Sequence, residues 1–148
     1  MALTFKHLFR KPITTQYPEE RLTVSRRTRG TQLIWNRDTC IACSACARAC
    51  PVGCIDIVTS RGDDNKLKVD NISIDFGQCI FCGLCVEACP IGNVLYMSYN
   101  WEYAEYQRQK LVLSNDELLP SEKRQPSGYA HPEVEETLPK QTLLLDRS

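Results

Sequence analysis

The chain has 148 residues, equal numbers of basic and acidic side chains, and nine cysteines. This length fits one domain with extensions or at most two small domains, and no apolar run approaches the roughly 18 residues that cross a bilayer. The first residues are basic but lack a long apolar stretch and a small-residue cleavage site, so we expect no signal peptide. We therefore expect a reducing compartment, where cysteine clusters bind metals more often than they form disulfides. The odd cysteine count also suits a complete disulfide framework poorly.

The N-terminal segment is basic. Residues 1–38 carry eight Lys or Arg against three Asp or Glu, which marks either a docking arm or a solvated surface. Phe5, Leu8 and Phe9 follow the i, i+3, i+4 spacing of one helix face. We expect a short helix, ended by Pro12, that docks on a membrane surface or membrane subunit; packing on the protein's own core is the alternative. No basic surface interleaved with aromatic residues is visible, so we expect no nucleic-acid partner.

A twelve-residue cysteine motif occurs twice. CIACSACARACP occupies residues 40–51, and CIFCGLCVEACP occupies residues 79–90, with every cysteine repeated 39 positions later. The flanking apolar residues repeat in the same frame, which indicates an internal duplication. Each unit reads as strand, cysteine loop, short helix and strand. The expected strands are 33–35, 55–57, 72–74 and 94–96, the expected helices are 44–50 and 83–89, and residues 59–70 form a hairpin or loop between the units.

The spacing C-x2-C-x2-C-x3-C-P is the bacterial iron–sulfur pattern, in which the fourth cysteine binds the other cluster of a two-cluster protein. We therefore expect two [4Fe–4S] clusters with crossed ligands. The first would be held by Cys40, Cys43, Cys46 and Cys89, and the second by Cys79, Cys82, Cys85 and Cys50. Zinc sites usually pair two separated C-x2-C units instead. A [3Fe–4S] cluster usually goes with a missing second cysteine, and disulfide-stapled loops are the remaining alternative.

Other reactive side chains carry weaker signals. Cys54 repeats as Asn93, so we expect a small buried residue rather than a ligand, with a redox thiol or replacement ligand as the alternative. His7 and His131 lie far from the motifs, and we expect both on the surface. No catalytic set and no phosphate-binding glycine loop is visible. Two clusters bridged by crossed ligands would lie close together, so the chain is expected to conduct electrons rather than to bind a substrate.

The C-terminal third is expected to hold one helix and a tail. Apolar and tyrosine residues predict a helix at 101–113 that packs on the core or on another subunit, and Ser114 with Glu117 predicts a capping box. Four prolines after residue 119 indicate an extended or disordered tail. The expected fold is α+β, with a duplicated bacterial ferredoxin-like core at 33–97. An N-terminal helical or extended arm (1–32), a C-terminal helix (98–119) and the tail (120–148) surround this core.

Several segments outside the motifs carry a family resemblance. QYPEE at 16–20, RRTRG at 26–30 and EYAEYQRQKLVLSNDELL at 102–119 flank the two motifs. Together they resemble the ferredoxin-like subunit of respiratory complex I, subunit I of bacterial NADH–quinone oxidoreductase, over roughly residues 1–119. The chain departs from that family at Ala42, where glycine is frequent. This departure leaves the ligands intact but could tighten the loop or alter one cluster potential.

The resemblance implies a membrane-associated electron relay. The eight cysteines would pass electrons from the NADH-oxidising end toward the terminal cluster and the quinone. The N-terminal helix would lie at the membrane arm, on the cytoplasmic face of a bacterial cell membrane. The chain itself would carry electrons without a substrate site, and its partners would include the terminal-cluster and membrane-arm subunits. A related membrane-bound hydrogenase, a ferredoxin- or F420-linked quinone reductase, a free two-cluster ferredoxin and a zinc-stabilised interaction module stay open as alternatives.

Overall fold

The computed structural model describes residues 1–10, 14–122 and 124–142. The chain divides into two compact units, which are described separately. One unit combines Met1–Ser25 with the segment that begins at Pro139, and the other spans Arg26–Leu138. The larger unit contains all the cysteines and mixes short helices with antiparallel strands.

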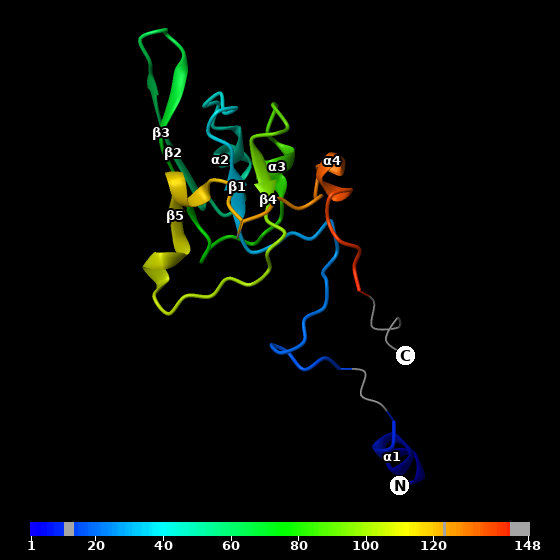
Figure 1. Cartoon of the computed structure of the whole chain (residues 1–148). Helices are drawn as coiled ribbons and strands as arrows, with labels where there is room; N and C mark the ends of the chain where they lie inside the picture. The colour runs from blue at the N-terminus through cyan, green and yellow to red at the C-terminus, as the bar shows by residue number, and fades with distance from the viewer. Residues whose placement is uncertain (11–13, 123, 143–148) are drawn as a thin grey trace. The chain divides into compact units, whose positions relative to one another are not determined.

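Two antiparallel sheets organise the larger unit. In one, β1 (Leu33–Trp35) pairs with β4 (Leu95–Met97), and Ile34 lies opposite Tyr96. In the other, β2 (Ile55–Arg61) and β3 (Leu67–Asp75) form a hairpin, and β3 also pairs with β5 (Val112–Ser114). Figure 1 shows the far end of this hairpin standing clear of the helices. The hairpin expected between residues 59 and 70 is thus confirmed, with strands longer than expected.

Two short helices follow the cysteine loops. They are α2 (Ala45–Ala49) and α3 (Leu84–Glu87), and they contact each other side by side (Figure 1). Both lie inside the predicted helical segments, which Pro51 and Pro90 end because a proline in the interior of a helix lacks the N–H that the helix requires. The order of elements is therefore strand, helix, strand, strand, helix, strand.

The core lies between the sheets and the two helices. In β1 and β4, Leu33, Trp35, Leu95 and Met97 are almost completely buried. Alternate residues of a strand point to one face, so Ile72 and Ile74 of β3 reach the same core cluster. The 3-10 helix η2 (Asn115–Leu118) adds the fully buried Leu118.

The helix expected at 101–113 is wrong. Residues 101–105 have no regular structure, and they are followed by the 3-10 helix η1 (Arg108–Leu111) and then by β5. In β5, Leu113 is buried whereas Val112 is exposed, which is the two-residue period of a strand. The Tyr103 hydroxyl donates a hydrogen bond to the carbonyl of Lys110 at 2.7 Å. Pairing with β3 and this side-chain bond therefore replace the helical hydrogen bonds that the apolar pattern predicted.

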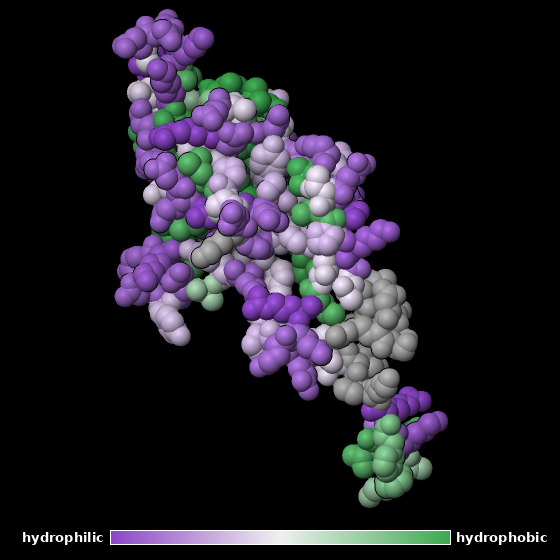
Figure 2. All heavy atoms as spheres, viewed as in Figure 1, coloured by the Kyte–Doolittle hydropathy of each residue, from purple (hydrophilic) through white to green (hydrophobic). Residues whose placement is uncertain are grey.

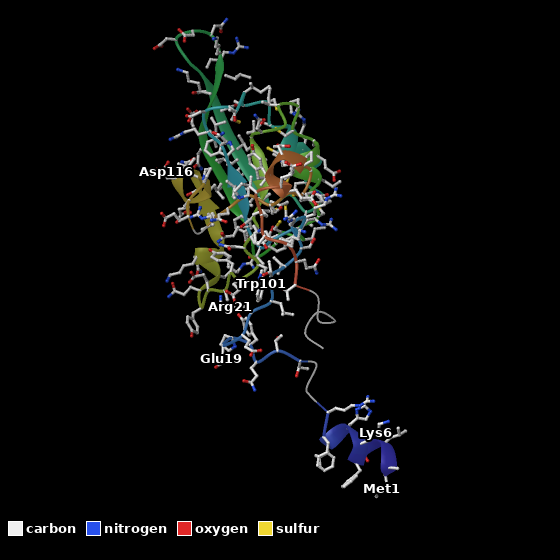
Figure 3. All side chains as sticks on the ribbon, turned by 45° about the vertical axis from the view of Figure 1, so that its right-hand side comes forward. Met1, Lys6, Glu19, Arg21, Trp101 and Asp116 are labelled. Atoms are coloured by element: carbon white, nitrogen blue, oxygen red, sulfur yellow. The ribbon has the colours of Figure 1, made fainter. Side chains whose placement is uncertain are left out.

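The capping box predicted at Ser114 and Glu117 is confirmed, although it caps a 3-10 helix. The Ser114 N–H donates to the Glu117 carboxylate at 3.0 Å. Asp116, in the same turn (Figure 3), pairs with Arg37 at 3.6 Å and so links η2 to the segment after β1.

Within the expected tail, the described residues 120–122 and 124–138 are more ordered than expected. Ser98 forms a bridge with Pro126, and Ser127 is buried. The short helix α4 (Pro132–Glu135) follows, and Leu138 packs inside the unit. Polar composition misled the prediction because the segment is fixed by backbone hydrogen bonds, such as that from Ser127 N–H to the Met97 carbonyl at 2.8 Å. The part of the expected tail at 143–148 lies outside the described residues.

The smaller unit begins with α1 (Ala2–Leu8), which confirms the predicted N-terminal helix. Its predicted end at Pro12 lies outside the described residues. The side chains of Phe5, Leu8 and Phe9 are 67%, 75% and 75% exposed, and the two phenylalanine rings meet edge to face. Figure 2 shows the resulting apolar surface beside polar atoms, and Figure 3 labels Met1 and Lys6 on the same helix. Among the described helices, none has both the length and the apolar character that crossing a bilayer requires.

Candidate metal centre

The first candidate site is a cavity lined by cysteines from both motifs. Cys40, Cys43 and Cys46 come from the first motif, and Cys89 comes from the end of the second. The other lining residues are apolar apart from Ser44, and they include Trp35, Ile57, Val69, Ile72 and Leu95. The structure therefore brings together the four cysteines that the sequence assigns to the first cluster.

The second candidate site has the same composition with the motifs exchanged. Cys79, Cys82 and Cys85 come from the second motif, and Cys50 comes from the end of the first. The remaining lining consists of apolar residues, glycine and Cys54. Each site thus draws three thiols from one motif and one from the other, because α2 and α3 carry the fourth cysteine of each motif toward the opposite site.

Both cysteine loops use left-handed backbone at equivalent positions. Ala42 and Ser44 in the first loop have φ of 56°, and Phe81 and Gly83 in the second have φ of 52° and 83°. A left-handed residue other than glycine costs about 1–2 kcal/mol. Three non-glycine residues of the loops, Ala42, Ser44 and Phe81, carry this strain. In the second loop, the Phe81 N–H is directed at the Cys79 Sγ at 3.4 Å. A donor that points at sulfur stabilises a thiolate ligand.

At least one thiol in each site resists ionisation in the absence of iron. Burial raises the pKa of Cys46 to about 11 and that of Cys85 to about 12, and the neighbouring thiols add to both shifts. Cys50 behaves differently: burial favours its protonated form, but backbone N–H groups, led by that of Cys54, outweigh burial and lower its pKa. Metal binding releases such protons because only the thiolate is a ligand.

Cys54 is buried, as the sequence predicted, and only 6% of its surface is exposed. Its Sγ lies 3.5 Å from the Sγ of Cys50, at the edge of the second site. Burial raises the pKa of the Cys54 thiol strongly, with a further contribution from its contact with Cys50. It is therefore a protonated neighbour of the four expected ligands in the absence of iron.

The two sites fit a polynuclear group. All nine cysteines are free thiols, and each site offers the sulfurs of four motif cysteines around an apolar cavity. Within the described ranges, no three His, Cys, Asp or Glu side chains converge closely enough to hold one metal ion. The sulfurs around a single zinc ion each lie about 2.3 Å from it, whereas ligands at the corners of a cube stand further apart. The donor set therefore matches [4Fe–4S] clusters, for which cysteine thiolates are the usual ligands.

Residues outside the motifs support the second loop, and sequence reasoning missed them. The Arg29 guanidinium donates a hydrogen bond to the carbonyl of Cys82 at 2.9 Å and lies over the ring of Tyr129. The Tyr129 hydroxyl donates to Glu87 of α3. Tyr129 lies so close to Gly83 that a Cβ there would stand 2.4 Å from the Tyr129 ring. No periodicity in the sequence marks these contacts, because they join segments far apart in the chain.

The two histidines differ. His7 is exposed, as expected. The expectation for His131 is wrong: the residue is 5% exposed, its Nε2 lies 3.2 Å from the Leu95 carbonyl, and its Nδ1 lies 3.1 Å from the Glu133 carboxylate. Its ring also contacts Tyr96. His131 immediately precedes α4 and contacts Leu95 of β4 and Glu133 of α4, so a histidine from a polar segment lies in the interior.

Comparison with known proteins gives one consistent result. Residues 39–93 match the family described as "4Fe-4S dicluster domain". The chain is 50% identical over 117 residues to "NAD(P)H-quinone oxidoreductase subunit I" of Prochlorococcus marinus (strain MIT 9303), a match that covers 78% of this chain and 52% of the relative. It is 45% identical over 124 residues to "NADH-quinone oxidoreductase subunit I" of Chromohalobacter salexigens, with 80% and 68% covered.

Among solved structures, the chain is similar to one chain of "the membrane-bound sulfane sulfur reductase (MBS), an archaeal respiratory membrane complex". The TM-score is 0.50 at 33% sequence identity, and the match covers 64% of this chain and 48% of that chain. The present chain spans about half the length of the Prochlorococcus relatives that it matches.

Proposed function

Because the chain belongs to the NADH–quinone oxidoreductase subunit I family, we propose that it is the electron-transfer subunit of a membrane-associated NADH–quinone oxidoreductase. It would relay electrons through two [4Fe–4S] clusters toward the quinone site. The observation that carries this proposal is the pair of cavities, each lined by four motif cysteines that come from both motifs. By itself the chain would be an electron carrier, and oxidation of NADH would belong to its partners.

The proposed ligands follow the two cavities. Cys40, Cys43, Cys46 and Cys89 would hold the first cluster, and Cys79, Cys82, Cys85 and Cys50 would hold the second. When bound, each cluster supplies reversible one-electron exchange. The apolar lining keeps water away from the sulfurs, and the loops aim backbone donors such as the Phe81 N–H at them. These are the properties by which a protein sets a cluster's potential.

We propose that residues 33–97 form a duplicated ferredoxin-like core. The 39-residue offset relates β1 to β3, α2 to α3 and β2 to β4. The observed pairings, β1 with β4 and β2 with β3, are exchanged by the same offset. Such an exchange is what a pseudo-two-fold arrangement requires. It places Cys50, just after α2, and Cys89, just after α3, at the crossing between the two sites.

The two short helices would keep the clusters at a fixed separation. α2 includes Cys46 of the first set and ends immediately before Cys50 of the second. α3 includes Cys85 of the second set and is followed by Cys89 of the first. Because α2 and α3 contact each other, a change in the spacing of the sites would require one helix to move against the other. A fixed separation suits electron transfer between two adjacent centres.

The N-terminal arm at 1–32 is proposed to dock the chain in the assembly. Its helix and the two residues after it expose Phe5, Leu8 and Phe9 beside Lys6 and Arg10, a combination that suits the interface between apolar lipid and anionic headgroups. We place the chain peripherally on the cytoplasmic face of a bacterial cell membrane. Its partners would be the terminal-cluster and membrane-arm subunits of a complex I-type assembly, and nucleic acid would not be among them.

One observation also supports a second type of membrane-bound complex. The likeness to a chain of the sulfane sulfur reductase complex would also fit the relay subunit of a related membrane-bound hydrogenase or ferredoxin-linked reductase. The higher identity to subunit I relatives, 44–50% against 33%, favours the NADH–quinone assembly. A free two-cluster ferredoxin would need no α1 docking surface.

The deciding experiment recovers the tagged chain from gently solubilised membranes and identifies its partners by mass. The proposal expects a flavin-bearing NADH dehydrogenase and membrane subunits, together with iron and acid-labile sulfide for two clusters. A nickel–iron or sulfur-reducing partner would instead assign the chain to the second type of complex. Recovery of the chain alone in the soluble fraction would contradict both assemblies, and zinc without sulfide would contradict the clusters.

A further inference from the structure

The indole of Trp35 carries a buried donor without an acceptor. Trp35, the last residue of β1, is 1% exposed, and its Nε1–H has no hydrogen-bond partner among the described residues. An unsatisfied buried N–H costs about 1–3 kcal/mol, and buried indole N–H groups usually find a partner. The position therefore calls for an acceptor that the protein's own atoms do not provide.

Trp35 borders the first cluster site. Its side chain lines the same cavity as Cys40, Cys43, Cys46 and Cys89. The side chain also lines a hollow together with Arg37, Asp38 and Lys68, and the Arg37 guanidinium lies 5.9 Å from the ring centroid. Arg37 and Lys68 donate hydrogen bonds and cannot accept one, and the Asp38 carboxylate, which can accept one, is not a partner of the Trp35 Nε1–H. In the cavity itself, Ser44 is the only lining side chain other than apolar residues and cysteine, so sulfur is the main acceptor available to the ring.

The donor belongs to one site only. The 39-residue offset relates Trp35 to Ile74, which is buried and has no polar side-chain atom. The second site is bordered by Cys54. Cys54 has no cysteine equivalent at the first site, because the repeat relates it to the exposed Asn93. Two sites with the same ligand pattern therefore differ in the side-chain donors around them. Hydrogen bonds to the sulfurs are one of the means by which a protein sets a cluster's potential.

We propose that Trp35 is a positioning residue of the first site, whose Nε1–H donates a hydrogen bond to a sulfur of the first [4Fe–4S] group. This inference rests on the proposed ligand sets. Reduction adds negative charge to the cluster, so a donor to sulfur stabilises the reduced form more than the oxidised form. Trp35 consequently raises the potential of the first cluster and leaves that of the second unchanged.

The test is a redox titration of the cluster-loaded chain, followed by electron paramagnetic resonance. Trp35→Phe keeps an aromatic ring but removes the donor. We expect the potential of one cluster to shift to more negative values and that of the other to stay in place. The matched control is Trp101→Phe, which changes the chain's other tryptophan, 40% exposed and absent from the lining of either site. Equal shifts of both clusters, or no shift of either, would overturn the proposal.

A second measurement leaves Trp35 in place and so does not depend on the folding of its variant. In Trp101→Phe protein labelled with ¹⁵N-tryptophan, Trp35 is the only labelled side chain, since the sequence has two tryptophans. Electron–nuclear double resonance of the reduced protein is expected to show coupling of one cluster to this nitrogen and to its exchangeable proton. If both clusters are present but neither shows this coupling, the proposed role of Trp35 is refuted, whereas the proposed function is not. Wild-type protein without clusters would instead refute the proposed function.

Discussion

The guanidinium of Arg29 donates a hydrogen bond to the backbone carbonyl of Cys82, 53 residues further along the chain, at 2.9 Å. Cys82 is the middle cysteine of the second loop, so a residue outside both motifs holds that loop from its backbone. The same guanidinium lies over Tyr129, with its Cζ 5.3 Å from the ring centroid. The second loop is thus fixed by one residue that precedes the core and one that follows it.

We predict that Arg29→Met weakens the second cluster site selectively. Methionine keeps much of the apolar stem over Tyr129 but removes the donor, which contributes about 1 kcal/mol in an exposed position. The expected result is faster loss of one cluster during exposure to a chelator, measured from the visible absorbance and from the resonance signal of each cluster. Arg61→Met, at the tip of the β2–β3 hairpin, is the control. Equal rates in both variants would contradict the role of Arg29.

Gly83→Ala should disrupt the second loop for two reasons. Its φ of 83° is left-handed, and the new Cβ would stand 2.4 Å from Tyr129 Cε1. Left-handed strain of about 1–2 kcal/mol and overpacking of about 1–3 kcal/mol both lower the free energy of unfolding. Denaturant titration of the cluster-loaded chain measures the loss.

Gly92→Ala separates the two causes. Gly92 has a similar φ of 78°, but a Cβ there meets no atom within 4 Å. We expect this variant to lose only the strain contribution. The double variant Gly83→Ala/Tyr129→Ala should recover part of the Gly83→Ala loss by removing the ring. If Gly92→Ala is as destabilised as Gly83→Ala, contact with Tyr129 has no energetic weight.

Much of the candidate site could be predicted from the cysteine motifs, whereas the structure of the surrounding segments was harder to predict from the sequence. The cysteine spacings and the 39-residue repeat predicted which thiols share a cavity, because this spacing is typical of two-cluster proteins in which the fourth cysteine belongs to the other site. The helix expected at 101–113 failed because Val112 and Leu113 gain more from pairing with β3 than from a helical turn, a choice made by distant residues. The roles of His131 and Arg29 could not be predicted from the sequence either, because their contacts join segments that meet only in the folded chain.

The ligand partition predicts which cysteine variants share a phenotype. Cys50→Ser and Cys82→Ser lie in different motifs but should damage the same cluster, because both line the second cavity. Their double variant should therefore keep the first cluster. In contrast, Cys43→Ser combined with Cys50→Ser, both in one motif, should damage both clusters. Iron content and resonance spectra of the two double variants distinguish these outcomes, and the reverse pattern would assign each cluster to a single motif.

Cys54→Ala should retain both clusters. The Cys54 thiol is a neighbour of the proposed ligand Cys50, at 3.5 Å between sulfurs, and fills a small buried space. Removing one buried sulfur should cost about 1 kcal/mol of folding free energy without loss of iron. The measurement is the iron content of Cys54→Ala, determined by elemental analysis and compared with that of Cys50→Ala, which should lose one cluster. Iron loss in Cys54→Ala equal to that in Cys50→Ala would make Cys54 a ligand and overturn the second set.

His131→Ala tests whether the C-terminal segment stabilises the core. The imidazole is buried between β4 and α4, with Nε2 3.2 Å from the Leu95 carbonyl and its ring against Tyr96. Truncation leaves a cavity and a carbonyl that has lost one partner, so we expect a loss of about 2–4 kcal/mol in the free energy of unfolding. His7→Ala, at the chain's other and exposed histidine, should change it by less than about 0.5 kcal/mol. Similar unfolding midpoints for both variants would show that the segment after β4 contributes little to the stability of the cluster-binding core.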